Sequence, residues 1–177
     1  MYSRIIINII FLLSLFVLQF AFVSGLPGWL NSTNLVLIVL IFLISMDKAI
    51  LAFWWLLGLG FLMEMFSFLP SGVIIVSLSL VFLLVYTLLI NYFTDRTLYT
   101  FFAITLIATL AYEMLLYSLN YIIAFMTRGD ESFGLNASFW LQIMDGLAIN
   151  LILVFLFYHT VNYLSKNLKP VFLIRRK

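Results

Sequence analysis

Long apolar runs, cut by short groups of polar and turn-forming residues, dominate the chain. A helix that crosses about 30 Å of hydrocarbon needs about 20 successive apolar residues. Six pieces of that composition result when the sequence is divided where charges, Pro, Gly or Asn gather. The pattern predicts an all-α polytopic membrane helix bundle, one membrane domain over residues 1–177. Its six transmembrane helices are expected at about residues 5–24, 35–46, 49–68, 73–92, 98–125 and 139–164.

Two boundaries in this division need an argument. The apolar stretch from Leu35 to Phe68 is interrupted only by Asp47 and Lys48 and is too long for one crossing, so it predicts two short helices joined by a tight turn. The first run follows Arg4, as in a cleavable signal peptide, but it is longer than the about 7 to 15 apolar residues typical of such signals. We therefore expect the first helix to be retained in the membrane.

Composition supports lipid as the solvent. Of the 177 residues, 66% are hydrophobic and 9% are charged, whereas a globular domain is about half apolar and about a quarter charged. The mean hydropathy is +1.22. A surface built from such a chain matches the hydrocarbon of a bilayer and not water.

The same composition excludes several classes of function. A net charge of +2 cannot form the broad basic surface that nucleic-acid binding requires. The chain has no cysteine and one histidine, His159, which excludes disulfides, thiol catalysis and multi-ligand Cys or His metal sites. There is no G-x-S-x-G, Walker or H-E-x-x-H motif. We expect no metal, no cofactor and no catalytic constellation.

The positions of the basic residues predict the orientation. Six crossings place one Lys or Arg, Arg128, on one side of the membrane and eight on the other. Because basic residues concentrate on the cytoplasmic side, both termini are expected on the cytoplasmic side of the membrane. The tail at residues 165–177 is expected to lie on anionic headgroups. The eight residues are Arg4, Lys48, Arg96, Lys166, Lys169, Arg175, Arg176 and Lys177.

Three acids fall inside predicted helices, and ionisable groups there are functional candidates because each costs about 2.5 to 3.5 kcal/mol to insert. All three lie at mid-depth or in the outer half, where no Lys or Arg is available to pair with them. The fifth helix also carries polar residues at steps of three and four, which share one face. Together these residues predict a polar seam of Glu64, Glu113, Tyr117, Asn120 and Asp145.

Several interpretations of that seam remain open. The acids can be protonated and hydrogen-bonded, holding helices together. They can bind a cation, a substrate or a partner's helix, or they can relay protons. Polar residues at Thr105 and Thr109 extend the stripe, and Gln142, Asp145 and Gly146 share a face of the sixth helix. Close packing between helices is expected at Gly58, Gly60 and Gln19.

Short motifs over about residues 10–125 resemble the MreD family of bacterial rod-shape-determining membrane proteins. Gln19 precedes an outer loop that leads into Asn34-Leu35-Val36-Leu37-Ile38. The stretch Gly60-Phe61-Leu62-Met63-Glu64 is followed by Pro70-Ser71-Gly72, similar to the family's Gly-x-x-x-Asp and its Pro and Gly turn, with Glu in place of Asp. Ala111-Tyr112-Glu113 looks like the family's acidic fifth span.

The resemblance implies a non-catalytic scaffold of the elongasome in the bacterial cytoplasmic (inner) membrane. Such a scaffold binds an MreC-like membrane partner and cell-wall synthesis proteins, and it couples peptidoglycan synthesis to MreB filaments. One alternative is the substrate-binding S-component of an energy-coupling vitamin transporter. Those components resemble one another in an alanine-rich face on the first span, where this chain has only Ala21. A membrane enzyme that uses a proton relay is a third class.

Overall fold

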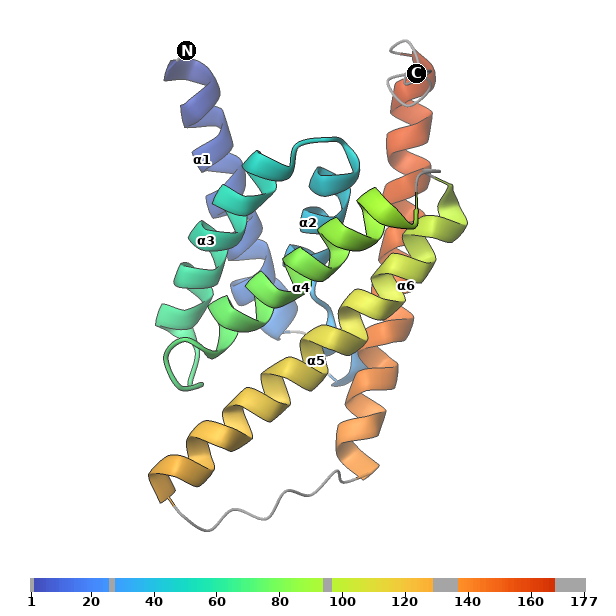
Figure 1. The fold of residues 1–177 in the computed structure, drawn as a ribbon. Helices are drawn as coiled ribbons and strands as arrows, with labels where there is room; N and C mark the ends of the chain where they lie inside the picture. The colour runs from blue at the N-terminus through green and yellow to red at the C-terminus, as the bar shows by residue number, and fades with distance from the viewer. Residues whose placement is uncertain (1, 26–27, 94–96, 129–136, 168–177) are drawn as a thin grey trace.

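The computed structural model describes residues 2–25, 28–93, 97–128 and 137–167, and these ranges contain six α-helices (Figure 1). The all-α prediction is therefore confirmed. Between α1 and α2 lie a π-helical turn, η1 (Leu18–Phe22), and two 3₁₀ turns, η2 (Val23–Gly25) and η3 (Gly28–Ser32). The α-helices are α1 (Tyr2–Val17), α2 (Leu35–Ser45), α3 (Ala49–Phe66), α4 (Val73–Asn91), α5 (Leu98–Arg128) and α6 (Ala137–Asn167).

Four of these helices are long and apolar enough to cross a membrane, namely α3, α4, α5 and α6. The other two apolar stretches, Ile5–Ala21 and Leu30–Ser45, are shorter. Large apolar side chains are exposed on five of the six helices, α2 being the exception, as expected where lipid surrounds the protein. The chain is therefore a multi-pass membrane protein by the length and composition of its helices, and its first two predicted spans fall short of full length.

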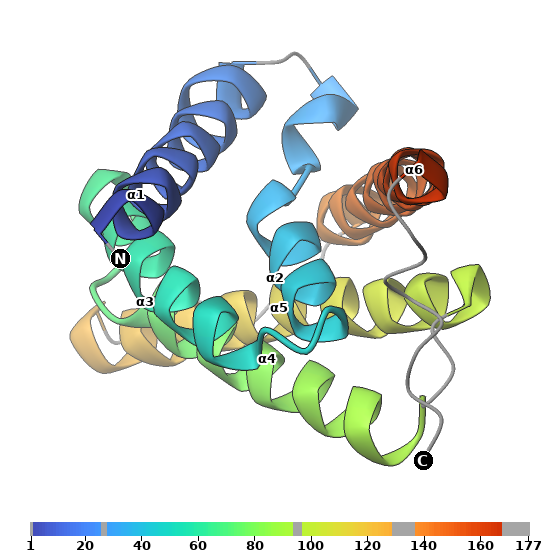
Figure 2. The same cartoon turned by 90° about the horizontal axis from the view of Figure 1, so that it is seen from above.

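Successive helices run in opposite directions through the bundle (Figure 1). The start of α1 and the end of α6 lie at the same end of the molecule, here called the proximal end, and the opposite end is called the distal end. Seen along the bundle, α2 lies in the centre (Figure 2) and contacts the other five helices. The core forms around it from fully buried aliphatic residues of five helices: Val36, Ile38, Ile41, Leu56, Leu59, Leu78, Ile104 and Val154.

A tight turn at the proximal end joins α2 to α3. Lys48 N–H donates to the Leu43 carbonyl over 3.0 Å, and Asp47 N–H donates to the Ile44 carbonyl, also over 3.0 Å. These two bonds form a Schellman motif, with Asp47 in the left-handed region at a φ of 59°. The turn lies where the sequence predicts it. Asp is one of the few non-glycine residues that tolerate the left-handed conformation.

Close contacts between helices occur at two glycines of α3. A Cβ on Gly58 would lie 2.9 Å from Leu12 Cδ1 of α1, and a Cβ on Gly60 would lie 3.1 Å from Ile75 Cγ1 of α4. The missing side chains let α1 and α4 approach opposite parts of α3, as small residues do at membrane helix interfaces.

Candidate functional site: a polar seam between α5 and α6

The site begins at a break in the backbone ahead of α2. From the turn with α3, the 11 residues of α2 span about 16 Å and the 18 residues of α3 about 27 Å. Thr33 and Asn34, which are not helical, therefore lie partway along the bundle, and both are buried. Non-helical backbone at such depth must find partners inside the protein, because hydrocarbon offers none.

Gln19 supplies two of those partners from the π-helical turn after α1. Its Nε2 donates to the Thr33 carbonyl over 2.9 Å, and its Oε1 accepts from Leu35 N–H over 2.7 Å. Asn34 caps α2 itself, because its Oδ1 accepts from Leu37 N–H over 3.0 Å. Gln19, which was predicted to pack the first span, thus hydrogen-bonds to the backbone on both sides of the break.

Asn150 of α6 completes the break and extends it to α5. Its Oδ1 accepts from Asn34 N–H over 3.0 Å, and its Nδ2 donates to Thr109 Oγ1 over 3.2 Å. Tyr112 of α5 is hydrogen-bonded to the Asn34 side chain. The result is a buried polar cluster that joins four parts of the fold: Gln19, Thr33, Asn34, Thr109, Tyr112 and Asn150.

A glycine of α6 lets η3 lie against this cluster. A Cβ on Gly146 would be 3.1 Å from the Ser32 carbonyl oxygen, which is a backbone atom with little room to move. The close approach places η3 beside α6. The absence of a side chain at Gly146 therefore makes room for the backbone that leads into the break ahead of α2.

Two contacts fix the register of α5 against α6. Thr109 is bonded to Asn150, and nearer the distal end the rings of Tyr117 and Phe139 are 4.5 Å apart. The midpoint of residues 109 and 117 is Glu113, and the midpoint of 139 and 150 falls at 144–145. Glu113 and Asp145 therefore lie at the same level of the two antiparallel helices, in what we call the α5–α6 seam.

The acids of the seam are half-buried and lack a partner among the described residues. No described residue donates a hydrogen bond to Glu113 or Asp145 or forms an ion pair with either. Lys48, whose side chain the structure describes, is exposed in the proximal turn. Such groups favour a partner that supplies donors, because an intramembrane carboxyl normally faces one.

Glu64 has a different environment. Its Oε1 accepts from Gly72 N–H and, over 3.3 Å, from Ile74 N–H, so the carboxyl group caps α4 from the last turn of α3. Gly72 adopts a φ of 98°, which aims these N–H groups at the carboxyl. The structure does not bring Glu64 into the α5–α6 seam, and its contacts are those of a capping group.

The remaining predicted polar residues divide into buried and half-buried sets. Thr105 and Thr109 are buried, whereas Tyr117 and Asn120 are half-buried in the distal half of α5. Gln142 is exposed, so the face that it was expected to share with Asp145 and Gly146 does not extend to it.

Sequence reasoning missed Asn150 and the role of Asn34. A signal existed for each. Asn150 follows Gly146 by one turn and so shares its face. Asn34 stands at the N-cap position ahead of an apolar run. Neither signal identifies the other residue as its partner, because 116 positions separate them.

Of the five predicted headgroup residues, Lys166 lies in the described part of the chain. Lys166 lies within α6, whose last described residue is Asn167, so the helix continues into the predicted tail. Four others lie outside the described residues: Lys169, Arg175, Arg176 and Lys177.

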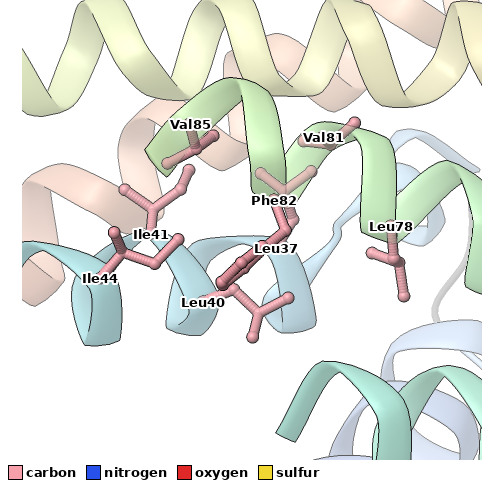
Figure 3. Close-up of a pocket in the computed structure, with 8 residues that line it drawn as sticks. All are labelled: Leu37, Leu40, Ile41, Ile44, Leu78, Val81, Phe82 and Val85. Atoms are coloured by element: carbon pink, nitrogen blue, oxygen red, sulfur yellow. The ribbon is translucent and has the colours of Figure 1, made fainter. Parts of the chain in front are cut away.

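A hollow between α2 and α4 carries no polar chemistry (Figure 3). Its cavity volume is about 10 Å³, against about 300 to 1,000 Å³ for typical small-molecule pockets. All eight lining residues are apolar: Leu37, Leu40, Ile41, Ile44, Leu78, Val81, Phe82 and Val85. The hollow offers no group that could orient a polar ligand.

Comparison with known protein families, with curated proteins and with solved structures finds no match to this chain.

Proposed function

We propose that the chain is a non-catalytic membrane scaffold of the cell-elongation machinery in the cytoplasmic membrane of a rod-shaped bacterium. It crosses the bilayer six times, with both termini and the basic tail in the cytoplasm. An MreC-like partner and cell-wall synthesis proteins assemble on it, which links peptidoglycan synthesis to MreB filaments. The family resemblance of the motifs around Glu64 and Glu113 is the basis for naming this machinery.

One structural observation supports a scaffold. The polar stripe of α5 continues beyond the part of the helix that the bundle buries: Glu113, Tyr117 and Asn120 lie distal to Tyr112, the last fully buried residue of α5 in the described structure. A polar stripe on a loosely covered helix favours assembly with another membrane protein.

The vitamin-transporter alternative lacks comparable support. A substrate-binding component needs a cavity with polar groups that fix the ligand. The hollow of Figure 3 is apolar and small, and the buried polar cluster uses its groups on its own backbone and side chains. Both features favour a scaffold over a vitamin-binding component.

Affinity capture of the tagged full-length chain from solubilised membranes of its own cells tests the proposal. We expect an MreC-like protein and cell-wall synthases to be recovered. The variant Glu113→Leu should lower their yield, and Gln142→Leu, an exposed position one turn from Asp145, should not. Recovery of an ATPase pair with a transporter T-component, or of a retained vitamin, would contradict the scaffold.

A further inference from the structure

The distal half of α5 is covered less completely by the rest of the bundle than its proximal half. Among residues 113–127 none is fully buried. The proximal half differs, because its buried residues recur at helical spacing: Thr100, Phe101, Ile104, Thr105, Ala108, Thr109 and Tyr112. This half-covered stretch of 15 residues is about 22 Å long, enough to span most of a hydrocarbon core.

Lipid alone is a poor cover for this surface. Apolar residues such as Met114, Ile122 and Phe125 are exposed there and suit hydrocarbon. Glu113 and Asn120 do not, because lipid tails supply no hydrogen-bond donor or acceptor. The surface therefore matches a helix that is mostly apolar but carries a polar group at one level.

The depth and the charge of that polar group follow from the register of α5 against α6. Glu113 and Asp145 stand at the same height, between the Thr109–Asn150 bond and the Tyr117–Phe139 contact. No described residue pairs with either acid, and the basic residues of the sequence lie near helix ends or in the tail. Two acids at one height complement a cation and repel another carboxylate.

We infer that the distal half of α5, with the α5–α6 seam, binds a transmembrane helix whose central turn carries a lysine or arginine that pairs with Glu113 and Asp145. The inference rests on the proposed function in that it names the kind of partner that the scaffold takes. The apolar part of the docked helix covers Met114 and its exposed neighbours on α5. The basic side chain brings the donors that the two carboxyl groups lack.

Designed peptides in vesicles test this inference without knowledge of the natural partner. The full-length chain, labelled at a single cysteine in place of the exposed Ser71, is reconstituted in phosphatidylcholine vesicles. Its energy transfer to labelled transmembrane peptides is then measured. The peptides are helices of about 20 Leu and Ala residues with Lys, Leu or Glu at the centre.

We expect the lysine peptide to associate about tenfold more strongly than the leucine peptide, since charge-assisted bonds exceed the neutral pairs of membrane helices. The glutamate peptide should show no gain. Moving the lysine two turns from the centre should remove most of the advantage. Glu113→Gln and Asp145→Asn should each reduce it, and Gln142→Leu should leave it unchanged.

Three results would overturn the inference. Equal binding of the three peptides would show that lipid-like packing suffices, and equal gains for lysine and glutamate would show polar association without charge preference. Self-association that prevents every peptide from binding would assign the surface to a second copy of this chain. Because the peptide series uses the unmodified seam, it decides the matter even where a variant does not fold. Selective lysine binding with failed capture of elongation proteins would reject only the proposed function.

Discussion

At the scale of single residues, the decisive side chains are amides that hydrogen-bond to backbone. Gln19 uses both ends of its amide group on either side of the break at Thr33 and Asn34, and Asn150 reaches the same break from α6. An amide suits this position because it both donates and accepts. Inside a membrane each such bond satisfies a backbone group that would otherwise lack a partner, and an unsatisfied backbone group is costly there.

Replacing Gln19 by leucine should lower the free energy of unfolding by about 2 to 4 kcal/mol, because the Thr33 carbonyl and Leu35 N–H each lose their partner in a buried site. The measurement is reversible unfolding in mild detergent. Ser14→Ala on α1 is the control: its exposed hydroxyl bonds the Phe11 carbonyl of its own helix, and the change should stay within about 0.5 kcal/mol. Similar losses for both variants would mean that Gln19 does not stabilise the break.

At the scale of elements, the helices follow from apolar length, and their ends follow from local chemistry. The turn at Asp47 is readable from sequence because two charges interrupt one long apolar run. The sequence also predicts a short second helix, but it does not predict the non-helical break at Thr33 and Asn34 that precedes it. Its backbone partners come from α1 and α6, and sequence spacing does not show which distant side chains meet.

Glu64 shows the same limit from the other direction. Its position inside an apolar helix predicted a place in the seam, since a membrane acid needs a partner. That partner is the N-terminus of α4, reached through a turn in which Gly72 takes a positive φ. The glycine was visible in the sequence, whereas the direction of the amides that follow it depends on how the turn folds.

The contact of η3 with α6 gives a prediction at this scale. Gly146→Leu should destabilise the protein by about 1 to 3 kcal/mol or more, because the new side chain meets the backbone at Ser32. Ala148→Leu, on the same turn of α6 but exposed, is the matched control and should change stability little. Thermal unfolding in detergent compares the two. Equal melting temperatures would argue against a close contact between η3 and Gly146.

At the scale of the whole molecule, two ends with different chemistry define the proposed orientation. The proximal end carries the start of α1, the turn at Asp47 and the end of α6 (Figure 1). The distal end carries the turn before α4. From the distribution of basic residues we propose that the proximal end faces the cytoplasm.

The lack of cysteine makes this orientation directly testable. Single cysteines at Ser71 and at Lys48, both exposed and at opposite ends, are offered to a membrane-impermeant thiol reagent in intact cells. After removal of any outer envelope, Ser71→Cys should react at once, and Lys48→Cys should react only after the membrane is opened. The unchanged chain is the blank, since it has no thiol. The reverse order of labelling would invert the proposed topology.

The bond between Asn34 and Asn150 has a consequence for biosynthesis. The chain emerges from the ribosome in order, so the Asn34 N–H ahead of α2 enters the membrane long before Asn150 of α6 exists to accept its hydrogen bond. Until α6 is made, α2, which is about 16 Å long, lacks the hydrogen bond that its N-terminal end makes with Asn150. Its final placement must wait for the last helix, so a nascent chain cut off after α5 would expose an unfinished site to membrane quality control.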